Sequence, residues 1–202
     1  MPRQSTTTKK SATSTKKASG TKKASGASSA AQQNTMLEKF VVDMLKDIYY
    51  AEKATLKSMA KMQKAATTQT LKDAFATHIE QTREQVTRLE EAFEMLGKKA
   101  QAKKCEAMDG LIAESQSAME DTEAGSMTRD VALIVSAQKA EHYEIASYGS
   151  LAQLARTMGN EDLAELMEQT LQEEKETDQL LTSIAENDIN FQAENEDEEE
   201  EE

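Results

Sequence analysis

The sequence lacks tryptophan, has one proline and one cysteine, and contains only 4% aromatic residues. The proline is Pro2, so no helix in the body of the chain is interrupted by one. Because aromatic residues are so few, the core must be built from Leu, Met, Ala, Val and Ile. Eleven methionines fit helices better than a sheet. The composition therefore predicts an all-α protein.

Long apolar runs are also missing. No run approaches the roughly 20 residues that span a bilayer, and no apolar signal segment is visible. The single cysteine, Cys105, excludes an internal disulfide and suits a reducing compartment. We therefore expect a cytoplasmic protein with no membrane contact, in which Cys105 is a buried apolar residue rather than a nucleophile.

The net charge of −13 is unevenly distributed along the chain. Residues 1–34 carry seven basic side chains and no acid, whereas residues 186–202 carry ten acids and no base. Segments of this kind bury too little apolar surface to offset the entropy lost on ordering. The charge pattern predicts a disordered basic tail over 1–34, a folded domain over 35–187 and a disordered acidic tail over 188–202.

Each tail allows two interpretations. The Lys-Lys repeats within residues 1–34 could make weak, non-specific contact with nucleic acid through counterion release, or could serve only as a solubilising leader. The negative charge of the body opposes the first interpretation. The acidic end is typical of a solvated tail, with a role in binding cations or partners as the alternative.

Apolar residues recur at helical spacing in four long segments, which predict helices at about 35–65, 71–96, 128–158 and 161–186. The connection between the second and third helices covers residues 98–126 and holds a short fifth helix, at roughly 103–120. About 18 helical residues cover roughly 27 Å, enough to run back along a bundle. The long crossover makes the second and third helices parallel, which is the ferritin-like four-helix arrangement.

Polar groups interrupt the inner faces of all four helices. On a wheel centred on Gln138, His142 falls inside the apolar stripe, Glu141 falls on its shoulder and Glu144 points outside it. Counting from the interhelical turns places the inward polar groups at one level, halfway along the bundle. Carboxylates and imidazoles are costly to bury without partners or a cation. The candidate site residues are therefore Glu52, His78, Glu141, His142, Glu174 and Asp178.

Several segments of the body resemble those of a known family. They are 50–53, 78–82, 104–112, 138–149 and 173–175 with Asp178. On these segments the body of the chain, about residues 36–187, resembles the YciE/YciF family of ferritin-like stress proteins, and the two tails lie outside the resemblance. The resemblance implies a rubrerythrin-like four-helix bundle, a homodimer, a di-metal centre and a cytoplasmic role in stress.

Four carboxylates and two imidazoles are the ligand inventory of di-iron and di-manganese bundles, and four negative charges would balance two divalent ions. The usual Glu-x-x-His spacing is absent, and the residue three positions after His78 is the neutral Gln81. Helix 161–186 offers Glu174 and Asp178 four residues apart, with no histidine. The pattern thus matches the residue types of a di-metal site but not its usual spacing.

Two main interpretations follow. In the first, two iron (or manganese) ions bind Glu52 and Glu141, or Glu144 if its helix is rotated, and the remaining candidate residues complete the ligand shell. The reaction is then oxidation of Fe(II) by oxygen or peroxide, or consumption of peroxide by a redox-cycling pair of metal ions. In the second, the same groups form a non-catalytic, hydrogen-bonded network that fixes the register of the helices. A third possibility is a DNA-associated protective protein that acts through residues 1–34.

Overall fold

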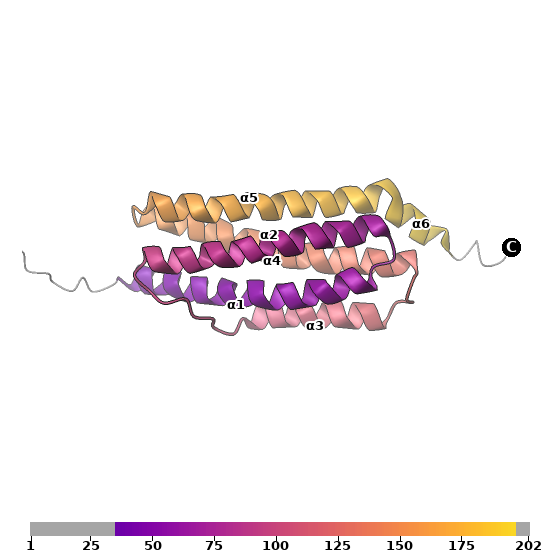
Figure 1. Ribbon diagram of the computed structural model, residues 1–202, viewed down its shortest axis with the longest axis horizontal. Helices are drawn as coiled ribbons and strands as arrows, with labels where there is room; N and C mark the ends of the chain where they lie inside the picture. The colour runs from indigo at the N-terminus through magenta and orange to yellow at the C-terminus, as the bar shows by residue number, and fades with distance from the viewer. Residues whose placement is uncertain (1–34, 197–202) are drawn as a thin grey trace, which may run out of the picture. The chain divides into compact units, whose positions relative to one another are not determined.

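The computed structural model describes residues 35–196, and within them every regular element is a helix, which confirms the all-α prediction (Figure 1). The basic segment 1–34, with its predicted nucleic-acid contact, and residues 197–202 lie outside the described part. The helices are α1 (Met36–Ala65), α2 (Gln69–Met95), α3 (Glu106–Glu120), α4 (Met127–Thr157), α5 (Glu161–Ile184), a π-helical segment (Ala185–Ile189) and α6 (Asn190–Glu194).

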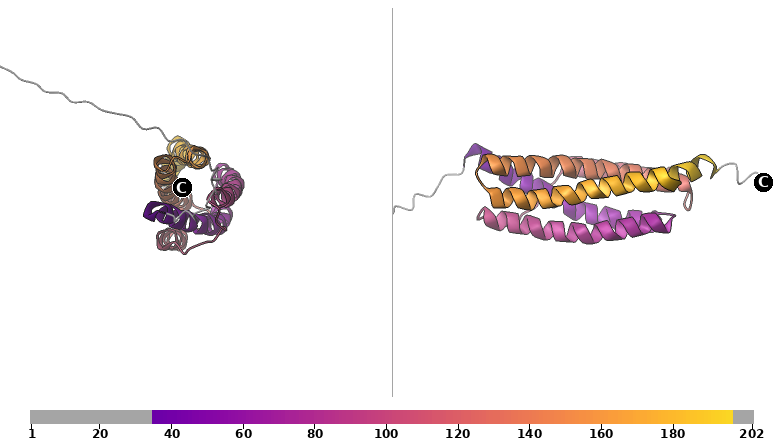
Figure 2. Two further views of the ribbon diagram at one scale, coloured as in Figure 1. Left: turned by 90° about the vertical axis from the view of Figure 1, so that its left-hand side faces the viewer. Right: turned by 90° about the horizontal axis from the view of Figure 1, so that it is seen from above.

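The four long helices form two antiparallel hairpins, α1 with α2 and α4 with α5 (Figure 1). α3 runs along the outside of the bundle, next to α1 and α4, as the end-on view in Figure 2 shows. Because α3 carries the chain back to the other end of the bundle, α2 and α4 run in the same direction. The predicted ferritin-like crossover is confirmed.

The helix ends follow the local sequence. Thr35 caps α1 in a capping box with Glu38, and Gly97 and Gly159 adopt positive φ angles of 63° and 74° just after α2 and α4. Buried Cys105 caps α3: its Sγ accepts the N–H of Met108 at 3.4 Å and lies 3.1 Å from the hydroxyl of Tyr143 on α4. Cys105 therefore fixes the start of the crossover helix against the bundle.

The apolar core is divided into two clusters along the bundle. One cluster includes Leu45, Leu89 and Leu163, and the other includes Phe75 and Leu181. In all four long helices, the segment between the two clusters carries a buried polar side chain. This polar layer, midway along the bundle as predicted, consists of Glu52, His78, Glu141, Glu144 and Glu174.

The folded part extends past residue 187, where the acidic tail was expected to begin. The π-helical segment places Ile189 in an apolar cluster. The carboxylate of Glu196 then accepts the backbone N–H groups of Met127 at 2.6 Å and Thr128 at 3.1 Å, and these bonds lower its pKa. The free N–H groups at the start of a helix favour an anion, so the start of α4 holds the end of the described chain.

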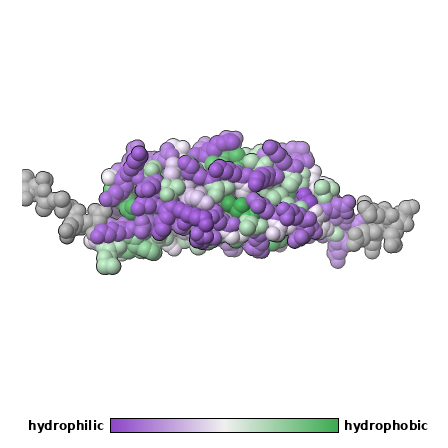
Figure 3. All heavy atoms as spheres, turned by 90° about the horizontal axis from the view of Figure 1, so that it is seen from below, coloured by the Kyte–Doolittle hydropathy of each residue, from purple (hydrophilic) through white to green (hydrophobic). Residues whose placement is uncertain are grey.

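The face of the bundle shown in Figure 3 is largely hydrophilic, with small scattered apolar patches. Among the described residues, none of the helices combines the length and the apolar character that a bilayer crossing requires.

Candidate metal centre

The polar layer brings together side chains from four helices. Glu52 comes from α1, His78 from α2, Glu141 and Glu144 from α4, and Glu174 from α5. None of the five is more than 3% exposed. The layer is therefore shielded from bulk water on all sides by the bundle.

Four of these residues surround a common point. His78, Glu141, Glu144 and Glu174 each offer a ligand atom, and these atoms all lie within 4.8 Å of one another. The Nε2 atom of His78 lies 3.0 Å from Oε1 of Glu141 and 3.7 Å from Oε2 of Glu174. Two ligands that bind one ion at about 2.1 Å and at right angles are themselves about 3.0 Å apart. The spacing of the four groups therefore fits a shared cation.

Several atoms of the layer have no hydrogen-bond partner among the described residues. They are Oε2 of Glu141, both carboxylate oxygens of Glu174 and Nε2 of His78, whose neighbour Oε1 of Glu141 is an ion-pair partner only when the imidazole is protonated. Buried polar atoms are normally paired, because an unpaired one carries its full desolvation cost. A metal ion would satisfy all four at once. The donor set, one imidazole with several carboxylates, is one that iron and manganese accept.

The layer has more acidic than basic side chains. Arg88, a buried base, makes hydrogen bonds of 2.6 and 2.7 Å to Glu173 and one of 3.0 Å to Thr170, so its charge is already paired. Burial raises the pKa of Glu52 and the pKa of Glu141 to about 8. Without a cation, these carboxyl groups retain protons at neutral pH, and divalent ions would displace them.

The pKa values of the other two carboxyl groups of the layer are also raised well above their ordinary range. Burial is the main cause for both Glu144 and Glu174, and the charges of neighbouring carboxylates add to it. For Glu144 the first of these neighbours is Glu52, and for Glu174 it is Glu141. All four acids therefore disfavour ionisation for the same reason, their shared burial without a counter-ion.

Three hydroxyl groups hold the inner residues in place. Thr177 Oγ1 lies 3.2 Å from His78 Nδ1, which leaves Nε2 free to face the carboxylates. Thr55 donates to Glu144 at 3.3 Å, and buried Tyr148 donates to Glu52. Partners of this kind fix the orientation of metal ligands. Thr177 stands three residues after Glu174, the position that histidine takes in the usual Glu-x-x-His motif.

Two of the six predicted site residues lie outside the layer. The side chain of His142 is 70% exposed, so its predicted inward orientation is wrong, and its Nε2 lies 3.3 Å from Oδ1 of Asp178. Asp178 is only partly buried and also accepts the amide of Gln138 at 3.1 Å. The other four, Glu52, His78, Glu141 and Glu174, are all buried in the layer. Three of them, all but Glu52, have ligand atoms within 4.8 Å of one another.

Glu144 is the residue that the helical wheel misplaced. The inward face of α4 follows residues 134, 137, 141, 144, 148 and 151, a spacing of three and four. Gln138, taken as the centre of the wheel, lies at the edge of that face. Two of these inward positions, Glu141 and Glu144, are acidic. A wheel centred on the apolar residues alone is therefore rotated away from the true inward face. The three-residue spacing between Glu141 and Glu144 was the signal in the sequence that could have found the pair.

The sequence of this chain matches those of known proteins. Residues 36–194 match the family described as "Domain of unknown function (DUF892)". Protein YciF of Escherichia coli (strain K12) is 44% identical over 160 residues, which are 79% of this chain and 96% of that protein.

Two solved structures are similar to the bundle. The crystal structure of the E. coli stress protein YciF matches with a TM-score of 0.73 and 42% identity, over 78% of this chain and 99% of that one. YcfI from Rhodopseudomonas palustris, described as a candidate structural protein, matches with a TM-score of 0.71 and 35% identity, over 76% and 97% of the two chains. The chain therefore belongs to the DUF892 family of YciF-like helical proteins.

Proposed function

We propose that this YciF-like protein acts in the stress response by binding iron or manganese in the polar layer and oxidising Fe(II) with oxygen or peroxide. The observation that carries the proposal is the set of unpartnered, buried ligand atoms that His78, Glu141 and Glu174 direct at one another. The stress role is that of the E. coli relative. The oxidation chemistry follows from the donor set, which suits redox-active iron.

The residues have separate tasks in this proposal. His78, Glu141, Glu144 and Glu174 would hold the first ion, and Glu52, oriented by Tyr148, would contribute to a second. Four carboxylates would balance the charge of two divalent ions. Bound iron supplies one-electron transfer to the oxidant. The apolar clusters on either side exclude bulk water and keep the ligands in fixed positions.

A purely structural network is the rival function. Its support is the pair of hydrogen bonds from Tyr148 to Glu52 and from Thr55 to Glu144, together with the description of the R. palustris relative. A buried polar network stabilises a bundle only when its donors and acceptors all have hydrogen-bond partners. The unpartnered oxygens of Glu174 favour the metal centre instead.

Anaerobic titration with Fe(II) and Mn(II) tests the proposal. We expect about two ions per chain and a melting temperature that rises with metal concentration. Addition of oxygen or peroxide should then produce the ultraviolet absorbance of ferric iron. Binding of fewer than about one ion per chain, with a melting temperature indifferent to metal and chelator, would leave only the structural network.

Replacing Thr177 with valine should weaken metal binding about tenfold, the smaller end of the range for outer-shell partners. Valine keeps the shape of the side chain but removes the hydroxyl 3.2 Å from His78 Nδ1, so the imidazole loses its orientation. The dissociation constant for Mn(II), measured by calorimetry, reports the change. The matched control is Thr87→Val on the exposed face of α2. Equal dissociation constants for the two variants would show that Thr177 does not position His78.

A further inference from the structure

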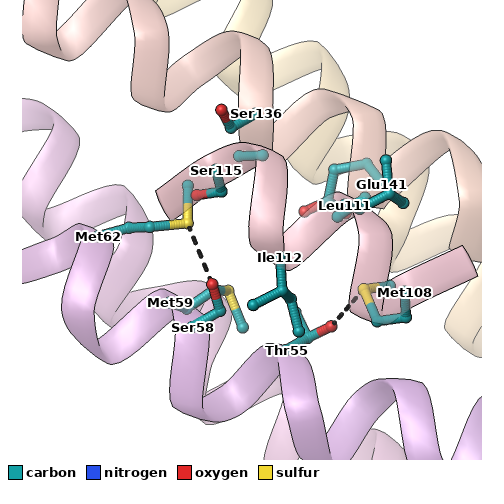
Figure 4. Close-up of a pocket in the computed structure, with 12 residues that line it drawn as sticks. Thr55, Ser58, Met59, Met62, Met108, Leu111, Ile112, Ser115, Ser136 and Glu141 are labelled. Carbon is teal, nitrogen blue, oxygen red and sulfur yellow. Dashed lines mark hydrogen bonds between the residues drawn. The ribbon is translucent and has the colours of Figure 1, made fainter. Parts of the chain in front are cut away.

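A small pocket lies beside the polar layer, between α1, α3 and α4 (Figure 4). Its cavity volume is about 20 Å³. A cavity of roughly 10–15 Å³ already holds a water molecule, so this pocket has room for a guest somewhat larger than water but not for one of many atoms. Glu141 belongs both to its wall and to the metal centre.

The lining of the pocket includes both partly exposed and fully buried residues. On the outer side it is lined by Leu111, Ile112 and Ala140, which are partly exposed, and on the inner side by buried Glu141. Thr55, also on the inner wall, donates to Glu144 at 3.3 Å. A molecule in the pocket therefore lies against Glu141 of the polar layer, and the hydroxyl of Thr55 separates it from Glu144.

The wall of the pocket can form hydrogen bonds. Three buried serines, Ser58, Ser115 and Ser136, contribute to it. The hydroxyl of Ser115 is buried and has no partner among the described residues, and the hydroxyl of Ser58 reaches only the sulfur of Met62, at 3.9 Å. Buried hydroxyls are normally paired, so the wall is suited to a small guest that both donates and accepts hydrogen bonds.

We propose that this pocket is the entrance through which hydrogen peroxide reaches the metal centre. The proposal rests on the proposed function of that centre. Peroxide fits the volume and can form hydrogen bonds with the serine hydroxyls, whereas dioxygen has no hydrogen-bond donor and is a very weak acceptor. Peroxide that reached two bound Fe(II) ions would accept one electron from each and take up two protons. Its O–O bond would break and it would leave as two water molecules.

Methionine oxidation offers a test that needs no metal. Met59, Met62 and Met108 line the pocket and are at most 3% exposed. Peroxide that enters transfers one oxygen atom to a thioether, giving a sulfoxide and water. In the metal-free full chain, mass spectrometry should show these three oxidising more slowly than exposed Met36 but faster than Met167, which is equally buried elsewhere.

Two variants should close the entrance. Ser115→Leu fills the pocket from α3, and Ala140→Leu narrows its rim without changing a buried residue. Either should slow oxidation of the pocket methionines about tenfold, because entry would then require local opening of the bundle. Met36 should be unaffected. Ser117→Leu, on the exposed face of α3, is the matched control. If Ser115→Leu does not fold, Ala140→Leu decides the question alone.

The same variants separate this proposal from the function of the centre. In the iron-loaded chain, both should slow oxidation of Fe(II) by peroxide while iron stoichiometry stays unchanged. The proposed entrance is wrong if the pocket methionines oxidise no faster than Met167. It is also wrong if neither variant slows their oxidation. Equal slowing with dioxygen would overturn the choice of peroxide. If the wild-type chain binds no iron, the proposed function fails, and the methionine pattern still decides whether peroxide enters.

Discussion

Replacing Glu174 with glutamine will lower the affinity of the chain for Fe(II) by about 100-fold or more. Loss of one charge from a fully buried ionic cluster costs about 3–5 kcal/mol, and each 1.4 kcal/mol is tenfold in affinity. Glu174 is completely buried, lies 3.7 Å from His78 Nε2 and has two unpartnered oxygens. Glutamine has the same size but no charge. Anaerobic calorimetric titration measures the change.

A neighbouring glutamate on the same helix provides the control. Glu176 is exposed, two residues after Glu174 in the sequence. Glu176→Gln removes the same net charge from the protein but leaves the polar layer intact. It should bind Fe(II) as the wild-type chain does. If both variants bind equally well, Glu174 is not a ligand, and the centre would have to be sought elsewhere.

The height of the polar layer could be derived from the sequence because helix rise is uniform. Counting residues from the turns is enough to place Glu52, His78 and Glu174 at one level. The apolar clusters on either side of them confirm the level. The length of the connection likewise fixed the direction of α4, since a segment of 29 residues with its own helix reaches the other end of the bundle.

Rotation about the helix axis was harder to derive. One residue turns a helix by about 100°, so a wheel centred one position away exchanges inward and outward residues. This is why His142 was expected inside and is exposed, while Glu144 was expected outside and is buried. Centring a wheel on apolar residues works when the inner face is apolar. It fails where a functional site places charges there, as on α4.

The side-chain contacts between helices could not be predicted from the sequence. The hydroxyls of Thr55, Thr177 and Tyr148 matter because of the side chains that face them from other helices. Such pairs depend on rotamers and interhelical distances, which periodicity does not contain. The C-terminal segment could not be predicted for the same reason. An acidic run is typical of a solvated tail, but here Ile189 packs in an apolar cluster and Glu196 accepts a free N–H group at the start of α4.

Replacing Glu141 with glutamine should make the metal-free protein more stable, and the gain should grow with pH. Burial raises the pKa of Glu141 from 4.5 to about 8 in the folded chain. Below pH 4.5 the carboxyl group is neutral in both states. Between pH 4.5 and 8 the unfolded chain loses the proton first, so the wild-type free energy of unfolding falls as pH rises. Glutamine cannot ionise, so the free energy of unfolding of the variant does not fall in this way.

The size of the effect makes it measurable by thermal unfolding. At pH 8 the variant should gain about 2–4 kcal/mol, or roughly 5–15 °C in melting temperature for a chain of this length. At pH 4, below the pKa of the carboxyl group in the unfolded chain, the two proteins should melt together, which controls for the other titrating groups. Saturating Mn(II) at pH 8 should then raise the melting temperature of the wild-type chain but not that of the variant. A difference in stability that does not depend on pH would mean that Glu141 is ionised in the metal-free bundle. The layer would then need another source of positive charge.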